Sequence, residues 1–197
     1  MILTVASFKG GVGKSTSAIH LAAYLQKKAP TLLIDGDVNR SVTNWANRGN
    51  PPFKVVDERQ AAKYARSYEH IVIDTPARPS HEDLKALVDG CDLLVIPSSP
   101  DAFALDALML TVDALVELDS DRYKILLTII PPAPSKEGEK ARASLTQSGL
   151  PVFKTGIRRL IAFQRSALLG VPIDEVDDPR AKQGWEDYQK VGKEILL

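Results

Sequence analysis

Residues 9–16 read Lys-Gly-Gly-Val-Gly-Lys-Ser-Thr and carry the strongest chemical signal in the chain. Glycines let the backbone turn tightly and bring successive N–H groups close to an anion. Lys14 follows Gly13 as in a phosphate-binding loop, where the lysine contacts the β- and γ-phosphates and the next hydroxyl, Ser15, ligates Mg²⁺. The general pattern has glycine at position 8, where this chain has Phe8. The segment predicts a nucleoside-triphosphate site.

A second lysine, Lys9, begins the same segment. The glycines that follow it have no side chains to bury it, so its ammonium group is free to reach toward a second phosphate chain. The alternative is an exposed lysine paired with a nearby acid. For the segment as a whole, the alternative is a glycine-rich turn between a strand and a helix that binds nothing.

Acidic residues follow two later apolar runs. Leu32–Ile34 leads into Asp35 and Asp37, and Ile71–Ile73 leads into Asp74. Because open α/β sheets bind ligands at the carboxyl ends of their strands, we expect these carboxylates near the phosphate loop. Carboxylates beside bound phosphates hold Mg²⁺. For either motif alone, a solvated loop carboxylate or a helix cap is the alternative.

Short β-branched apolar runs alternate with longer helical patterns, which predicts an α/β fold with a doubly wound, mostly parallel sheet in one domain over residues 1–197. Most runs are apolar throughout, as expected for strands covered on both faces. The expected strands are Ile2–Ser7, Thr31–Asp35, Phe53–Val56, Ile71–Asp74, Leu93–Pro97 and Ile125–Ile130, with a short edge strand at Val152–Phe153. The expected helices are Ser15–Lys28, Ser41–Arg48, Glu58–Tyr68, His81–Val88, Ala104–Glu117, Glu137–Ser148, Leu160–Leu168 and Arg180–Ile195.

The bulk composition excludes several classes of protein. The chain has 25 basic and 25 acidic residues, which argues against a surface coated for nucleic-acid binding but leaves room for a local basic face. Cys91 is the single cysteine, so neither an intrachain disulfide nor a two-cysteine metal site can form. The N-terminus lacks a basic leader region, and every apolar run is far shorter than the roughly 20 residues that cross a bilayer. The sequence predicts a cytoplasmic protein.

The octet at 9–16 resembles the deviant Walker A motif of the ParA/MinD family of dimerising ATPases, many of whose members also lack the glycine at position 8. The resemblance implies a P-loop NTPase fold and Mg²⁺-dependent hydrolysis of ATP to ADP and phosphate. It also implies that Thr16 bonds the α-phosphate. The residues expected to bind ATP in this segment are Gly10, Gly11, Val12, Gly13, Lys14, Ser15 and Thr16.

The same resemblance assigns roles around the phosphates. Lys9 would cross to the ATP of the other subunit, so that ATP holds a homodimer together and hydrolysis releases it. Asp37 would orient the attacking water, and Asp35 would support the Mg²⁺ shell. Asp74 would hold Mg²⁺ through water, while residues 75–77 would move with the γ-phosphate.

The residues that bind the base are less clear from the resemblance. Leu126–Pro134 occupies the place where the family usually has a strand that ends in an asparagine-containing loop, and it contains no asparagine. Backbone carbonyls near Pro131 and Pro132 are the candidates to accept the adenine amino group. The preference for ATP over GTP rests on the resemblance alone.

The segment from residue 152 to residue 173 resembles the part of ParA that leads to the last helices. Between Lys154 and Ile173 there are four basic residues and no acidic ones. Arg158, Arg159 and Arg165 are candidates for a patch that binds nonspecific DNA in a salt-sensitive way. The alternative is a solvated basic face, or pairing with the acids at 174–178.

The leading hypothesis is a nucleoid-associated, ParA-type positioning ATPase. A ParB-like protein or cargo adaptor would stimulate hydrolysis, and the cargo would be a plasmid, a chromosome or a protein assembly such as a carboxysome. The second hypothesis is a MinD-like membrane ATPase, because Trp185, Tyr188, Val191 and Ile195 form one helical stripe. Packing of that stripe on the core is the favoured interpretation. Metal-carrying relatives use paired cysteines, which this chain lacks.

Overall fold

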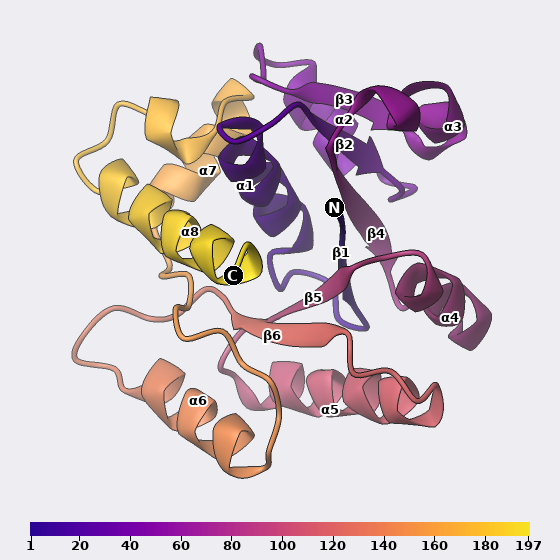
Figure 1. Cartoon of the computed structure of the whole chain (residues 1–197). Helices are drawn as coiled ribbons and strands as arrows, with labels where there is room; N and C mark the ends of the chain where they lie inside the picture. The colour runs from indigo at the N-terminus through magenta and orange to yellow at the C-terminus, as the bar shows by residue number, and fades with distance from the viewer.

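The computed structural model describes all residues from 1 to 197 and contains one six-stranded, fully parallel sheet (Figure 1). The strands lie in the order β3-β2-β4-β1-β5-β6, so the first strand is central and the chain winds outward in both directions. This confirms the predicted α/β doubly wound class. The strands are β1 (Ile2–Ser7), β2 (Thr31–Asp35), β3 (Lys54–Asp57), β4 (His70–Ala77), β5 (Leu93–Ser98) and β6 (Tyr123–Leu127).

Helices cover both faces of the sheet, which is why the strands are apolar throughout. Helices α1, α2, α7 and α8 pack on one face around Leu3, Leu33 and Val72, whereas α4, α5 and α6 pack on the other around Ala6 and Ile96. The α-helices are α1 (Lys14–Gln26), α2 (Ser41–Ala46), α3 (Ala61–Tyr64), α4 (His81–Asp89), α5 (Ala102–Glu117), α6 (Glu137–Gln147), α7 (Ile161–Leu169) and α8 (Ala181–Ile195).

Three predicted elements differ most from the structure. The helix expected over Glu58–Tyr68 is broken into a 3₁₀ turn, the single-turn α3 and a second 3₁₀ turn. The strand expected over Ile125–Ile130 ends at Leu127, because Ile129 has a positive φ of 52° and Ile130 turns to pair with Arg158 instead. Val152 forms only an isolated bridge with Ile125.

The C-terminal helix α8 buries the stripe that the sequence predicts. Trp185, Tyr188 and Val191 are all buried, and Ile195 packs against the same core. The stripe therefore belongs to the core. None of the helices is long and apolar enough to cross a bilayer.

His20 links α1 to the C-terminal part of the chain. Its Nε2 atom accepts a hydrogen bond from the N–H of Ile173 at 3.1 Å, so the ring proton lies on Nδ1 and is donated to the carbonyl of Thr16 at 2.6 Å. The ring also stacks on Tyr188, whose hydroxyl lies 3.1 Å from that of Ser17. Burial lowers the pKa of His20 from 6.5 to about 4.

A pH dependence of stability follows from His20. Its pKa is lower in the folded than in the unfolded state, so its contribution to stability is complete above pH 6.5 and is lost as the pH falls toward 4. We expect the free energy of unfolding of the wild type to fall by about 3 kcal/mol more than that of His20→Asn over this window. Urea titrations at stepped pH measure the difference, and parallel pH profiles for the two proteins would contradict the assignment.

Candidate nucleotide site

The phosphate loop lies between the end of β1 and the start of α1. Gly11 and Gly13 have φ angles of 77° and 87°, which residues with a Cβ atom rarely adopt. Gly13 caps α1 without a side-chain hydrogen bond, so the first N–H groups of this helix remain available to an anion. The Thr128 hydroxyl donates to the carbonyl of Val12 at 2.7 Å and fixes the loop to the end of β6.

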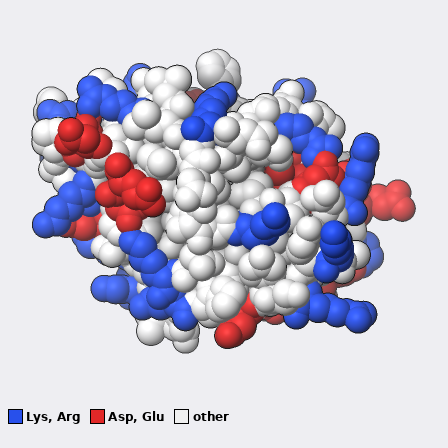
Figure 2. All heavy atoms as spheres, turned by 90° about the horizontal axis from the view of Figure 1, so that it is seen from above, with Lys and Arg blue, Asp and Glu red and all other residues white.

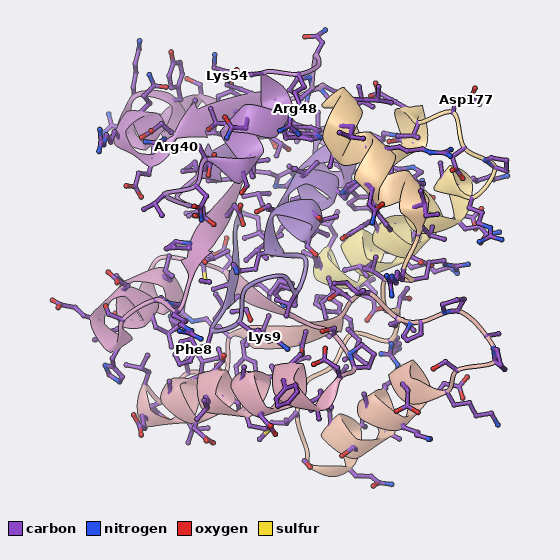
Figure 3. The ribbon with its side chains drawn as sticks, turned by 180° about the vertical axis from the view of Figure 1, so that it is seen from behind. Phe8, Lys9, Arg40, Arg48, Lys54 and Asp177 are labelled. Atoms are coloured by element: carbon purple, nitrogen blue, oxygen red, sulfur yellow. The ribbon has the colours of Figure 1, made fainter.

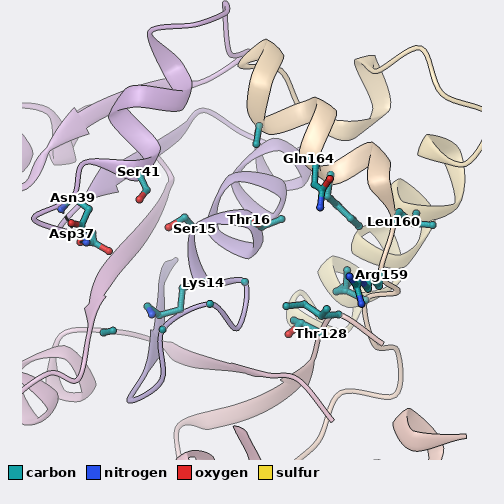
Figure 4. Close-up of a pocket in the computed structure, with 18 of the residues that line it drawn as sticks. Lys14, Ser15, Thr16, Asp37, Asn39, Ser41, Thr128, Arg159, Leu160 and Gln164 are labelled. Atoms are coloured by element: carbon teal, nitrogen blue, oxygen red, sulfur yellow. Dashed lines mark hydrogen bonds between the residues drawn. The ribbon is translucent and has the colours of Figure 1, made fainter. Parts of the chain in front are cut away.

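A pocket of about 790 Å³ opens beside this loop (Figure 4). Lys14, Ser15 and Thr16 form its floor, with Asp37 on one side and Arg159 on the other. The volume suits a nucleotide-sized ligand. The pocket is lined by Gly10, Gly11, Gly13, Lys14, Ser15, Thr16, Asp37, Val38, Asn39, Ser41, Pro76, Ala77, Thr128, Ile129, Ile157, Arg158, Arg159, Leu160, Phe163, Gln164, Ala167 and Tyr188.

Lys14 is buried at the phosphate end of the pocket, with 7% of its surface exposed. Its ammonium group donates to the carbonyl of Lys9 at 3.3 Å, which aims it across the loop. Burial lowers the pKa of Lys14, and the negative charges of Asp74 and Asp37 oppose that shift. A bound phosphate chain would supply the anionic partner that this buried cation needs.

Asp74 is the buried carboxylate of the site. It is fully buried on β4, and neither of its oxygens has a hydrogen-bond partner in the protein. Burial raises its pKa from 3.8 to about 7, against the opposing effects of the Ser15 hydroxyl and Lys14. Two unpartnered carboxylate oxygens beside a hydroxyl fit the oxygen ligands that Mg²⁺ takes, directly or through water. Asp74 and Ser15 would therefore hold Mg²⁺, which neutralises phosphate charge.

The other two acids lie after β2 and have different surroundings. Asp35 is buried, and its oxygens accept hydrogen bonds from the N–H of Asp37 and from both the N–H and the hydroxyl of Thr43. Asp35 thus fixes the loop between β2 and α2. Asp37 accepts from the backbone and side chain of Asn39 and lines the pocket. Asp37 therefore lines the pocket beside the phosphate loop, whereas Asp35 does not, and the role of Asp37 in orienting a water stays a prediction.

Residues 75–77 form the last part of β4. The Thr75 hydroxyl donates to the carbonyl of Val5 at 2.9 Å, which joins this segment to the strand that precedes the phosphate loop. Pro76 and Ala77 line the pocket, and Arg78 follows with a φ of 58°. The predicted second switch thus lies at the phosphate end of the pocket.

Lys9 lies at the phosphate loop, next to Phe8 (Figure 3). It does not line the pocket that contains Lys14. It lines a neighbouring pocket of about 530 Å³, and its ammonium group lies 3.0 Å from Asp101 at the start of α5. The pairing of Lys9 with a local acid, which the sequence left open, is the arrangement seen in the single chain. The Lys9 side chain thus lies outside the pocket that contains Lys14.

The pocket wall away from the phosphates differs from the segment that the sequence singled out. Pro131 lines the neighbouring pocket and Pro132 lines neither pocket, so their contact with adenine stays a prediction. Instead, Ile129 and the chain from 157 to 160 border the main pocket, together with three residues of α7. Backbone pairing of Ile130 with the 157–159 segment brings these parts together. No local motif marks that pairing, so the sequence analysis missed Leu160, Phe163, Gln164 and Ala167.

The three candidate DNA-binding arginines have different partners. Arg158 makes a two-pronged ion pair with the buried Asp187, at 2.7 and 2.8 Å, and its guanidinium pKa is raised mainly by that hydrogen bonding. Arg165 pairs with Asp178 at 2.6 Å. Arg159 has no ion pair and borders both pockets. The alternative of pairing with the acids at 174–178 is therefore realised at Arg165.

A central strand that runs into a glycine-rich loop and helix, with acids at the ends of the two strands β2 and β4, defines a P-loop nucleotide-binding protein. Residues 3–173 match the family model of the CobQ/CobB/MinD/ParA nucleotide binding domain, so the chain belongs to this family and is an ATPase of the ParA/MinD type. The resemblance inferred from residues 9–16 is confirmed. Cys91 is buried, as a small apolar residue would be.

Two curated relatives and one solved structure illustrate the similarity. The chain is 33% identical to the Maintenance of carboxysome distribution protein A of Gloeobacter kilaueensis, over 98% of this chain and 93% of the relative. It is 29% identical to Protein ParA of Rhizobium radiobacter, over 93% and 88% of the two chains. A putative plasmid partition protein from Borrelia burgdorferi, bound to AMPPNP, has the same fold with a TM-score of 0.74, 20% identity and 98% coverage of both chains.

Proposed function

We propose that this ATPase forms an ATP-dependent homodimer that binds nonspecific DNA and positions a cargo. The proposal of a dimer rests on one observation. Lys9 belongs to the phosphate loop, yet its ammonium group lies outside the pocket of its own subunit. The transition state of phosphoryl transfer spreads negative charge over the γ-phosphate oxygens, where a cation supplied in trans greatly accelerates the reaction. Lys9 of one subunit supplies that cation to the ATP of the other.

Within each subunit, the other residues of the site position the reactants. Lys14 holds the β- and γ-phosphates, Thr16 the α-phosphate, and Asp37 orients the attacking water. Asp74 and Ser15 hold Mg²⁺, while Asp35 fixes the loop that carries Asp37. Hydrolysis removes the γ-phosphate that Lys9 contacts, so the dimer separates after turnover.

The cargo proposal follows the two curated relatives, which are named for carboxysome distribution and for ParA. Their similarity extends over nearly the whole chain, which supports a positioning ATPase whose hydrolysis is stimulated by a ParB-like protein or a cargo adaptor. The MinD-like alternative would require a C-terminal apolar face for the membrane. The stripe on α8 that would form it is buried in the core, so we favour nucleoid DNA as the surface.

Any DNA contact must come from a local patch. Acidic and basic side chains are interspersed over the face seen in Figure 2, and Arg158 and Arg165 are paired with acids. Arg159 has no ion pair. Three exposed lysines on one side of α8 also have none, and Glu186 is the one acidic residue among them on that side. We propose that Arg159 and these lysines, Lys182, Lys190 and Lys193, provide the DNA contacts, doubled by dimer symmetry.

The experiment is DNA binding measured at several salt concentrations with ATP, with ADP and without nucleotide. We expect ATP-dependent binding whose affinity falls steeply with salt, and a smaller salt slope after the three α8 lysines are changed to alanine. The matched control changes three exposed basic residues near α3, namely Arg59, Lys63 and Arg66, and keeps the wild-type slope. If ATP produced no DNA binding at low salt, the nucleoid hypothesis would be wrong.

A further inference from the structure

In the ion pair between Lys9 and Asp101, the carboxylate is held in place by two further hydrogen bonds. Asp101 caps the N-terminus of α5 by accepting the N–H of Ala104 at 3.0 Å, and its second oxygen accepts the Ser99 hydroxyl at 2.5 Å. These contacts hold the carboxylate in one orientation independently of Lys9. The Ser99 hydrogen bond chiefly, and the contacts with Lys9 and Ala104, lower the pKa of Asp101, so the carboxylate is ionised at neutral pH.

The pair lies in its own pocket, across the loop from the phosphate site. Both residues line the 530 Å³ pocket, which shares Gly10, Gly11, Ile129 and Arg159 with the main pocket. Lys9 is about one-third exposed and Asp101 about one-half exposed, so solvent reaches the pair. An exposed ion pair of this kind is weak and exchanges readily. A phosphate chain carries more negative charge than one carboxylate and therefore competes well for the same ammonium group.

We propose that Asp101 is a positioning residue that holds Lys9 within its own subunit until the γ-phosphate of the partner's ATP takes it over. The inference rests on the proposed trans role of Lys9. The ion pair adds a free-energy cost to dimer formation. Because the dimer is symmetric, two pairs must break for each dimer formed. Asp101 thereby raises the ATP concentration at which the dimer assembles, and it keeps Lys9 paired in the monomer.

Asp101→Asn tests the proposal, because asparagine is as good an N-cap as aspartate and keeps the geometry while it removes the charge. We expect the AMPPNP concentration for half-maximal dimer formation to fall by about threefold to tenfold at low salt, since two weak pairs no longer have to break. Light scattering or sedimentation measures the dimer, and the shift should shrink at high salt. The matched control is Asp106→Asn, an exposed acid on the same helix without an ion pair, and it should leave the midpoint unchanged.

Two results would overturn the proposal. One is an unchanged or raised midpoint for Asp101→Asn; the other is an equal shift when Asp101→Asn is made in a Lys9→Ala background, because the effect would then not pass through Lys9. Failure of the proposed function gives a different result, namely wild-type turnover by Lys9→Ala alone. If Asp101→Asn lowers the midpoint as expected, and this shift is lost in the Lys9→Ala background, the result supports both the role of Asp101 and the proposed function.

Discussion

Replacing Lys9 with alanine is expected to lower the ATPase rate by at least about tenfold, because the γ-phosphate transition state then loses a cation. The fold should survive, since the contacts of the Lys9 side chain are an exposed ion pair and the exposed ring of Phe103. Steady-state phosphate release with saturating Mg²⁺ and ATP measures the rate, and thermal unfolding checks the fold.

The matched control is Lys63→Ala, which removes an exposed lysine far from the loop in sequence. It should keep the wild-type rate. If Lys9→Ala also turned over ATP at the wild-type rate, Lys9 would have no catalytic role and its pair with Asp101 would be an ordinary surface contact.

Asp74→Asn is expected to stabilise the protein while it abolishes the reaction. Neither oxygen of the buried carboxylate has a hydrogen-bond partner in the protein, and Ser15 and Lys14 offset only part of the effect of burial, so in the absence of Mg²⁺ and nucleotide the charge costs stability. Its pKa is about 7 in the folded protein against an ordinary value of 3.8, a difference that corresponds to about 4 kcal/mol at high pH. We expect about 2–4 kcal/mol of added stability at pH 8 and at least about a hundredfold loss of ATPase activity.

The sign of the pH dependence is fixed by the raised pKa of Asp74. Its contribution to stability is complete below pH 3.8 and is lost as the pH rises through about 7, so the advantage of Asp74→Asn should be largest at pH 8 and smaller at pH 5. Urea unfolding in EDTA without nucleotide measures it. A variant less stable than wild type at pH 8 would show that Asp74 has a protein partner in solution.

Local signals predicted the phosphate site because its residues follow one another in the chain. The glycine loop, Ser15 and the acids at the ends of β2 and β4 come from short segments, and parallel pairing brings their ends to one edge of the sheet. The strands Ile2–Ser7 and Thr31–Asp35 were predicted with their observed bounds. For this part of the chain, the apolar runs and the glycine-loop motif both indicated a strand that leads into a phosphate-binding loop.

Contacts between distant segments were not predictable in the same way. Arg158 was a candidate DNA ligand from its basic neighbours, but it pairs with Asp187, which lies 29 residues later on α8. The partner of Lys9, Asp101, lies 92 residues away. The break in the helix expected at 58–68 also has no strong signal, since its residues favour a helix and no glycine or proline interrupts them.

The most direct test of the trans role of Lys9 is to mix two inactive proteins, Lys9→Ala and Asp37→Ala. In a mixed dimer, the Lys9→Ala subunit keeps Asp37 at its own ATP and receives Lys9 from its partner, so one site is complete. With random mixing of equal amounts, we expect about a quarter of the wild-type rate. If mixed dimers formed and the rate stayed at the sum of the two separate proteins, Lys9 would not act across the dimer.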